Sequence, residues 1–163
     1  MTVDEALRTI RRMMKDSEYS FFMTHGPDGG IHARLMQHFE PESDLTLWFG
    51  AGPGSRKVHE ITANRETTVS LMHPQHGGYV TLMGNVDIVT DNEAKKKYWR
   101  AHWTDIYPGG PENDQYLLLR FTPYRIELMD FADQDLPQPY GLKPIGLERT
   151  HDTWSVMSDR TDL

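Results

Sequence analysis

The sequence contains no cysteine, which excludes disulfide bonds and metal sites built from thiolates. It has no apolar run close to the roughly 20 residues that a membrane-spanning helix requires. Its first residues mix acids and bases, where a secretory signal would carry an apolar segment. We therefore expect a cytoplasmic protein with no membrane partner.

Basic residues are scarce: 17 Lys and Arg stand against 24 Asp and Glu, which gives a net charge of −7. A general nucleic-acid-binding protein would need a basic face, so no nucleic-acid partner is expected, although one local basic pocket is compatible with this balance. His73 and His76 flank a turn at Pro74 with no third ligand at useful spacing, so no metal site is predicted. The chain has 163 residues, enough for one domain with a substantial core.

Residues 45–64 are the most informative stretch, because they read as a strand, a glycine-rich loop and a helix. Alternating apolar residues over 45–49 predict a half-buried strand. The glycines at 50, 52 and 54 then break the strand and permit a tight turn. Ser55 is a favourable N-cap for a helix over 55–64.

The start of this helix has the composition of a phosphate site. Arg56 and Lys57 occupy the first turn, where the helix dipole disfavours cations unless an anion is bound there too. Free backbone N–H groups, a serine hydroxyl and two cations can together bind a phosphate. The segment is not a Walker loop, because Gly54 is followed by Ser55-Arg56-Lys57 and not directly by Lys. The alternative is a capped surface helix with two solvated cations.

The remaining pattern predicts short antiparallel strands with few helices. Thr2 and Glu5 form a capping-box pattern that opens a helix running to about Lys15, and Asp91 caps a second helix over 92–103 whose Lys95 to Lys97 should form the solvated side. Strands are expected at 19–25, 31–39, 67–72, 79–89, 116–122 and 124–131. Gly84 marks a bulge or barrel corner, and Pro123 should separate the last two strands. This order indicates a mainly β fold, a small antiparallel barrel with flanking helices.

The character of the chain changes at Ala132. Pro137, Pro139 and Pro144 follow, and no sustained apolar period is present. We therefore expect one domain over 1–131 and a C-terminal tail over 132–163 that is extended, disordered or wrapped around a partner subunit.

The chain resembles the pyridoxamine 5′-phosphate oxidase-like FMN-binding split barrels, and within them the general stress protein 26 group, over roughly residues 3–130. The segment 54–61, Gly-Ser-Arg-Lys-Val-His-Glu-Ile, is similar to the phosphate-binding segment of the oxidase. The segment 79–86 resembles the long strand that follows in that family, and 107–111 with 117–123 looks like the general stress protein group.

The resemblance implies a split β-barrel of antiparallel strands that forms a homodimer, with two FMN sites at the subunit interface. In this reading Ser55, Arg56 and Lys57 hold the FMN phosphate. The strand beside the isoalloxazine is His32, Ala33, Arg34, Leu35, Met36 and Gln37. The other implied cofactor contacts are Gly50 and Ala51 near the phosphate and ribityl chain, Tyr79 at the flavin, and Trp103 and Tyr107 at the flavin of the other subunit. Trp48, Trp103 and Tyr116 are expected as interface anchors, since Trp and Tyr are enriched at such positions.

Three features depart from the oxidase. It has a cation at each end of the isoalloxazine strand, where this chain has His32 and Gln37. It has an amide side chain where this chain has Tyr79, and its pyridoxal-phosphate-binding motif is not visible between residues 100 and 116. Phosphate anchoring is thus better supported than the oxidase's substrate.

The expected function is that of an FMN-binding general stress protein acting as an FMN-dependent oxidoreductase, with a substrate that the sequence does not specify. The flavin would supply hydride or electron transfer, so no catalytic residue is assigned; Arg34 and Gln37 could bond the polar edge of the ring. One alternative is a flavin-binding stress protein without turnover, and another is a related barrel that holds FAD, deazaflavin or heme. True pyridoxamine 5′-phosphate oxidase activity is not expected.

Overall fold

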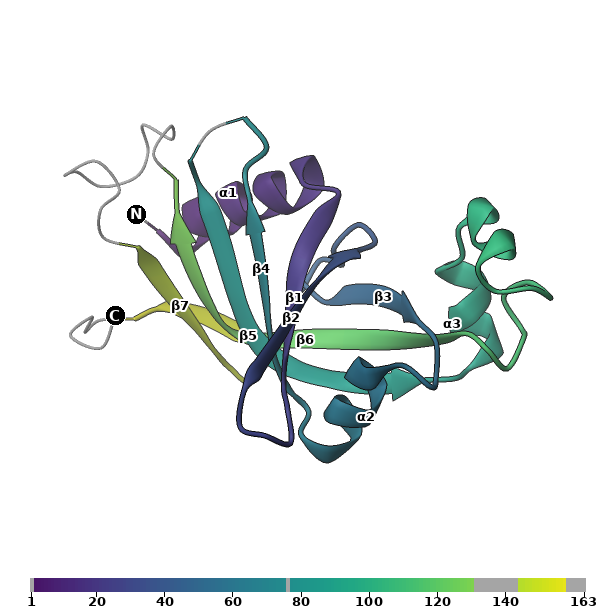
Figure 1. Cartoon of the computed structure of the whole chain (residues 1–163). Helices are drawn as coiled ribbons and strands as arrows, with labels where there is room; N and C mark the ends of the chain where they lie inside the picture. Colours follow the sequence, from purple (N-terminus) through teal and green to yellow (C-terminus); the bar gives the residue numbers. More distant parts are fainter. Residues whose placement is uncertain (1, 76, 131–143, 158–163) are drawn as a thin grey trace.

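The first helix, α1 (Val3–Asp16), begins at the predicted capping box. Thr2 Oγ1 accepts a hydrogen bond from the Glu5 N–H, and the Glu5 carboxylate accepts one from the Thr2 N–H. The computed structural model describes residues 2–75, 77–130 and 144–157, and Figure 1 shows α1 lying across the sheet. No helix within these ranges is long and apolar enough to cross a membrane.

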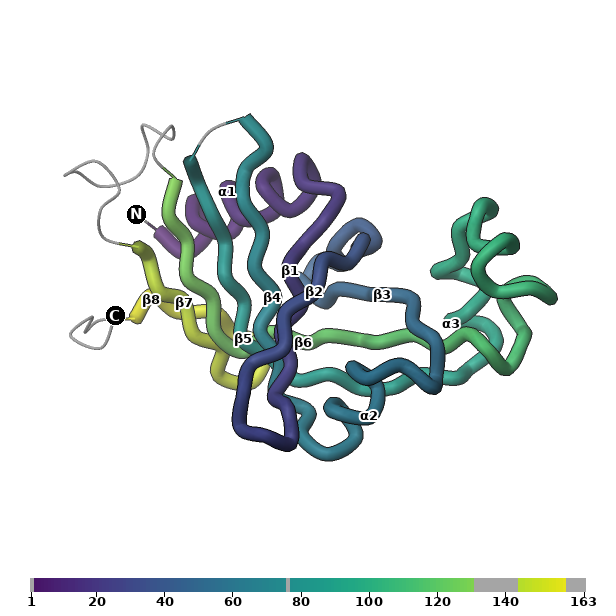
Figure 2. The backbone as a smooth tube through the Cα atoms, in the orientation of Figure 1, coloured from purple at the N-terminus to yellow at the C-terminus, as the bar shows by residue number. Residues whose placement is uncertain are grey.

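Within the described part of the chain, eight strands form one antiparallel sheet, which Figure 2 shows as a continuous, strongly curved layer. The order is β2-β1-β4-β5-β6-β7-β8, and β3 pairs with β6 off this path. The strands are β1 (Tyr19–His25), β2 (Ile31–Gln37), β3 (Leu47–Ala51), β4 (Glu66–Met72), β5 (Tyr79–Val89), β6 (Leu117–Met129), β7 (Ile145–Thr150) and β8 (Thr153–Val156). The first part of β6 pairs with β3 and its last part pairs with β7, so one long strand joins the two halves of the sheet.

The predicted irregularity at Gly84 is confirmed, because the register of β5 against β6 shifts between Met83 and Gly84. A Cβ at Gly84 would lie 2.4 Å from the Thr122 carbonyl oxygen, so no larger residue fits there without a backbone shift. The predicted break at Pro123 is wrong: Pro123 lies inside one continuous strand, opposite Gly84. The bulge accommodates the missing N–H of proline without ending the strand.

Other element boundaries also differ from the prediction, and the strand expected over 31–39 ends at Gln37. The third strand begins at Leu47 and not at residue 45, because Leu45 has a positive φ of 71° that is incompatible with a strand. The expected long helix over 92–103 is instead α3 (Asn92–Lys97) followed by a 3-10 turn, η1 (Ala101–Asp105). Asp91 caps α3 as predicted, by accepting from the Ala94 N–H.

The sheet does not end at residue 131. Residues 145–156, which the sequence analysis placed in the tail, form the hairpin β7–β8, and Leu147 pairs with Ile126 of β6. Ile145 and Leu147 belong to the main core, so burial of apolar side chains accounts for this pairing. Residues 132–143 and 158–163 lie outside the described part of the chain.

The interior has two separate apolar clusters. The main core lies between α1, α2 (Arg56–Ala63) and the sheet, and Phe22, Phe49 and Phe121 are fully buried in it. The second cluster, here called the aromatic lobe, is formed by Trp48, Tyr98, Trp103, Tyr116 and Leu118, with Phe39, Val89, Ala94, Trp99 and Tyr107 packed against them. Figure 1 shows α3, which contributes to this lobe, projecting away from α1.

One face of the sheet carries exposed apolar side chains. We call this the outer apolar face; its main members are Tyr19 (49% exposed), Phe21 (55%), Ile31 (58%), Leu35 (59%) and Met72 (69%). Phe21 lies opposite Leu35 on β2 and opposite Ser70 on β4, so these strands present one continuous surface. Contiguous apolar surface of this kind is typical of an interaction site.

Candidate anion site

The site is built around the first turn of α2, which the glycine loop places beside β1 and β2. Val58 and Ile61 are buried and fix the helix against the core. Ser55 occupies the N-cap position as predicted, but its side chain makes no capping hydrogen bond. Its hydroxyl is therefore available for another partner.

Ser55 Oγ is buried and has no hydrogen-bond partner within the described residues. Buried polar atoms in folded proteins almost always have one. The N–H groups of Arg56 and Lys57 open α2 beside it, and an α-helix leaves its first N–H groups without intrahelical acceptors. The next N–H groups, of Val58 and His59, donate to the Ser55 carbonyl. Unsatisfied donors around a buried hydroxyl at a helix start fit an anionic ligand.

Two cations face the same place. Burial and the nearby positive charge of Arg34 lower the pKa of Lys57. Burial also lowers the pKa of Arg34, while Glu60 opposes this effect. A bound anion would relieve both penalties. We call Arg34, Ser55, Lys57 and the first turn of α2 the anion cradle.

Arg34 reaches the cradle from the middle of β2 and is held there by three bonds. Its Nη1 donates to Thr24 Oγ1 at 2.6 Å and to the Phe22 carbonyl at 3.2 Å. Its Nη2 donates to Glu60 Oε2 at 3.2 Å. Since the side chain is only 19% exposed, these contacts fix the orientation of the guanidinium group.

Glu60 is the buried carboxylate on which this network converges. Its Oε2 accepts from Thr24 Oγ1 at 2.5 Å, and its Oε1 lies 3.5 Å from Arg56 Nε and accepts from His32 Nδ1. Burial alone would raise its pKa, but the hydrogen bonds from Thr24 and His32, and the charge of Arg34, lower the pKa to about 2. Glu60 is thus ionised at neutral pH.

The charges of the cluster match a phosphate monoester. Arg56 pairs with Glu60 and offsets its negative charge, so the two positive charges of Arg34 and Lys57 leave about +2 at the cradle. A phosphate monoester carries about −1.5 to −2 at neutral pH. Such a ligand would neutralise the site, whereas an uncharged ligand would leave two half-buried cations uncompensated.

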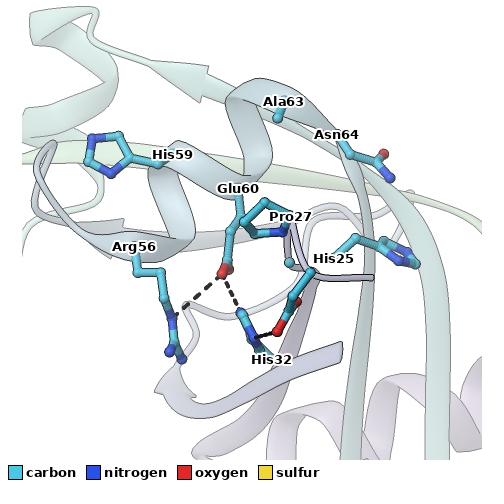
Figure 3. Close-up of a pocket in the computed structure, with 10 residues that line it drawn as sticks. His25, Pro27, His32, Arg56, His59, Glu60, Ala63 and Asn64 are labelled. Carbon is cyan, nitrogen blue, oxygen red and sulfur yellow. Dashed lines mark hydrogen bonds and ion pairs between the residues drawn. The ribbon is translucent and has the colours of Figure 1, made fainter. Parts of the chain in front are cut away.

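A pocket of about 560 Å³ opens between α2 and the β1–β2 turn, and Glu60 lines it. Figure 3 shows Glu60 reaching from α2 toward His32 and Arg56 at the wall of this pocket. Asp28 Oδ2 lies 3.6 Å from the second ring nitrogen of His32. Arg56, which the resemblance also assigns to the FMN phosphate, lines this pocket and pairs with Glu60.

The predicted isoalloxazine strand divides between the two faces of the sheet. His32 and Arg34 point toward Glu60, and Met36 packs against the main core. Ala33 and Leu35 point to the outer apolar face, because successive side chains of a strand alternate. Gln37 donates to Glu18.

Tyr79 lies on the outer apolar face, but far from the cradle within one chain. It pairs with Met72 at the end of β4, whereas α2 leads into the start of this strand. The structure of one chain therefore does not bring Tyr79 to Ser55 and Lys57.

Gly50, Trp103 and Tyr107 come together in the aromatic lobe. A Cβ on Gly50 would lie 2.5 Å from the Trp103 ring, and the rings of Trp103 and Tyr107 are 6.1 Å apart. Ala51 is buried in the main core. The expected interface anchors were Trp48, Trp103 and Tyr116. This expectation is wrong, because each side chain is at most 8% exposed and packs inside its own chain.

Thr24 and Glu60 are the members of the network that the sequence analysis missed. Glu60 is one helical turn after Arg56, a spacing that permits an ion pair, and this is the only local signal. Its contacts with His32 and Arg34 join residues 28 and 26 positions apart, which no local pattern reveals.

Comparisons with known proteins support the fold. The structure of general stress protein 26 from Bacillus anthracis superposes with a TM-score of 0.67 at 22% identity, covering 76% of this chain and 93% of that one. A general stress protein 26-related protein from Clostridium acetobutylicum gives 0.74 at 18% identity, covering 89% and 95%. A pyridoxamine 5′-phosphate oxidase-related, FMN-binding protein from Nostoc punctiforme gives 0.72 at 15% identity, covering 95% and 93%.

A curated relative, Protein bli-3 from Neurospora crassa, is 22% identical over 128 residues. The match covers 72% of this chain and 61% of that protein, so the chain spans less than two thirds of its relative. The predicted fold, a mainly β split barrel of antiparallel strands with flanking helices, is confirmed. Residues 5–136 match the family described as pyridoxamine 5′-phosphate oxidase like, and the chain belongs to this family.

Proposed function

We propose that this chain binds FMN through the anion cradle and uses it as an FMN-dependent oxidoreductase of the general stress protein 26 type. The observation that carries the proposal is the buried hydroxyl of Ser55, which has no partner among the described residues and lies beside the half-buried cations Arg34 and Lys57. The FMN-binding relative from Nostoc punctiforme, which shares the fold, supports the choice of ligand.

In this proposal Arg34, Ser55 and Lys57 hold the phosphate, and FMN supplies the hydride or electron transfer. The chain contributes binding and orientation: charge-assisted hydrogen bonds anchor the phosphate, and the strand 32–37 positions the ring. The other proposed cofactor contacts are Gly50, Ala51, Tyr79, Trp103 and Tyr107. Within one chain these residues belong to the core, the outer apolar face and the aromatic lobe.

Titration calorimetry of the apoprotein with FMN, riboflavin and FAD tests the proposal. We expect one FMN per chain, and riboflavin should bind at least about tenfold more weakly, because it lacks the group that the cradle recognises. Equal affinity for FMN and riboflavin would show that the phosphate is not held at this site. Tighter binding of FAD than of FMN would assign the dinucleotide as cofactor.

A second candidate is a flavin-binding stress protein with no dedicated substrate, which one observation favours. Each of the four Lys and Arg residues between β5 and β6 has a partner within the chain: Lys95 donates to the Asn113 carbonyl, Lys96 pairs with Glu112 and Glu93, Lys97 pairs with Glu42, and Arg100 donates to the His38 carbonyl. Lys95, expected on a solvated side, is only 4% exposed. These residues therefore offer no second phosphate site for pyridoxamine 5′-phosphate.

Turnover assays separate the candidates. We expect the FMN-loaded protein to form pyridoxal 5′-phosphate from pyridoxamine 5′-phosphate no faster than a free-FMN blank. Turnover of about 1 per second or more would contradict this and restore the oxidase assignment. Reduction by NADH or NADPH, with electrons passed to an acceptor faster than with free FMN, would favour the oxidoreductase over the non-catalytic protein.

We also propose a homodimer formed through the outer apolar face. Phe21, Leu35 and Met72 expose more than half of their surface on neighbouring strands. Tyr79 and Leu35, which lie on this same face, would become part of the interface. A flavin site between two subunits could then include residues that one chain keeps apart.

A further inference from the structure

The Glu60 carboxylate is surrounded by hydrogen-bond donors. Arg34 and Thr24 contact its Oε2, while His32 and Arg56 contact its Oε1. The Thr24 hydroxyl accepts from Arg34, so its own hydrogen is free to point to Glu60. An ionised carboxylate only accepts, and His32 Nδ1 must therefore carry a hydrogen in this arrangement.

A negative charge beside a phosphate site opposes phosphate binding, so charge alone does not explain Glu60. What the carboxylate does supply is a fixed orientation for Arg34. Of the five N–H groups of this guanidinium, three donate to Phe22, Thr24 and Glu60. The other two have no partner within the described residues, and two N–H groups are what a bidentate contact with a phosphate uses.

We propose that Glu60 is a positioning residue for the FMN phosphate: with Thr24 it holds Arg34 so that its two remaining N–H groups face the anion cradle. This rests on the proposed function, because it assumes that the cradle binds phosphate. Glu60 itself does not touch the ligand. Positioned donors lose less freedom on binding, which increases affinity.

Two kinds of substitution separate positioning from simple charge. Glu60→Gln replaces one carboxylate oxygen by an amide N–H₂ group, which donates and does not accept. The pair of donors that contacted this oxygen therefore loses its acceptor. It also removes the negative charge, which by Coulomb's law alone should strengthen anion binding. Thr24→Val removes the hydroxyl between Arg34 and Glu60 at nearly constant volume and changes no charge, and Thr24→Ser restores the hydroxyl.

The experiment measures the dissociation constants of FMN and riboflavin for the wild-type protein and these three variants. We expect Glu60→Gln and Thr24→Val each to weaken FMN binding on the order of tenfold and to leave riboflavin binding unchanged. Thr24→Ser should restore most of the FMN affinity. Glu93→Gln, at an 86% exposed carboxylate on α3, is the matched control and should change neither constant.

The outcomes distinguish this inference from the proposed function. If the wild-type protein prefers FMN and both Glu60→Gln and Thr24→Val preserve that preference, Glu60 does not position the cradle although the cradle binds phosphate. Tighter FMN binding by Glu60→Gln would show that the carboxylate acts only through its charge. Equal loss of FMN and riboflavin affinity would indicate a general structural role, and a wild-type protein without preference would refute the cradle itself.

Discussion

Lys57 illustrates how a single side chain is prepared for an anion. Burial and the charge of Arg34 lower the pKa of its ammonium group, so its charged form is destabilised while no anion is bound. A phosphate would reverse this effect, because an opposite charge stabilises the ammonium form. In the proposed function, the bound phosphate offsets the cost of keeping this cation half-buried.

We predict that Lys57→Ala weakens FMN binding by about 10- to 100-fold, since a hydrogen bond to a charged group is worth roughly 1.5–3 kcal/mol. Riboflavin binding and the free energy of unfolding should change little, because Lys57 makes no hydrogen bond or ion pair with another described residue. Calorimetric titration and urea unfolding measure both. Lys15→Ala, at a 72% exposed lysine on α1, serves as control, and an unchanged FMN constant for Lys57→Ala would place the phosphate elsewhere.

At the scale of an element, β3 shows that one glycine can have two interpretations. The resemblance assigns Gly50 to the cofactor, whereas the structure shows it pressed against the aromatic lobe. A Cβ there would lie 2.5 Å from Trp103 and 3.0 Å from Tyr116. These rings are large and packed on every side, so they cannot withdraw easily.

We predict that Gly50→Ala lowers the free energy of unfolding by about 1–3 kcal/mol, the usual cost of inserting a group into a packed core. Urea unfolding followed by tryptophan fluorescence measures the change. Gly54→Ala is the matched control, because a Cβ there meets no atom within 4 Å. A Gly50→Ala protein that keeps full stability but loses FMN would favour the cofactor interpretation over the packing one.

At the scale of the whole molecule, the sheet leaves one face uncovered. α1 and α2 cover the face that carries Phe22 and Val69, which are fully buried. The opposite face carries Phe21 and Leu35 in solvent. A second copy of the chain would bury this surface and bring Tyr79 of each chain into an interface.

We predict that Leu35→Asp converts a dimer into monomers, raising the dimer dissociation constant more than about tenfold, because a buried unpaired charge is costly at an interface. Light scattering at micromolar concentration, with FMN present, is the measurement. Val156→Asp, at a 41% exposed position on β8, should leave the mass unchanged. A wild-type protein that is monomeric under these conditions would contradict the homodimer.

The sequence alone determined the features that depend on short-range patterns. The capping box joins residues three apart, the β1–β2 hairpin follows from turn residues between alternating strands, and Ser55 starts a helix after a glycine loop. These signals were correct because each is decided by neighbours along the chain. The order of the segments 54–61, 79–86, 107–111 and 117–123 also identified the family.

Only the tertiary structure decided which side chains meet. Whether Lys95 is solvated or buried depends on Asn113, and whether residues 145–156 form a tail or a hairpin depends on β6. Glu60 looks like an ordinary helix-surface residue in the sequence. Its charged carboxylate is stable in the interior because hydrogen-bond donors from β1 and β2 compensate the cost of burying the charge. Those donors become neighbours of Glu60 only when the sheet and α2 pack together.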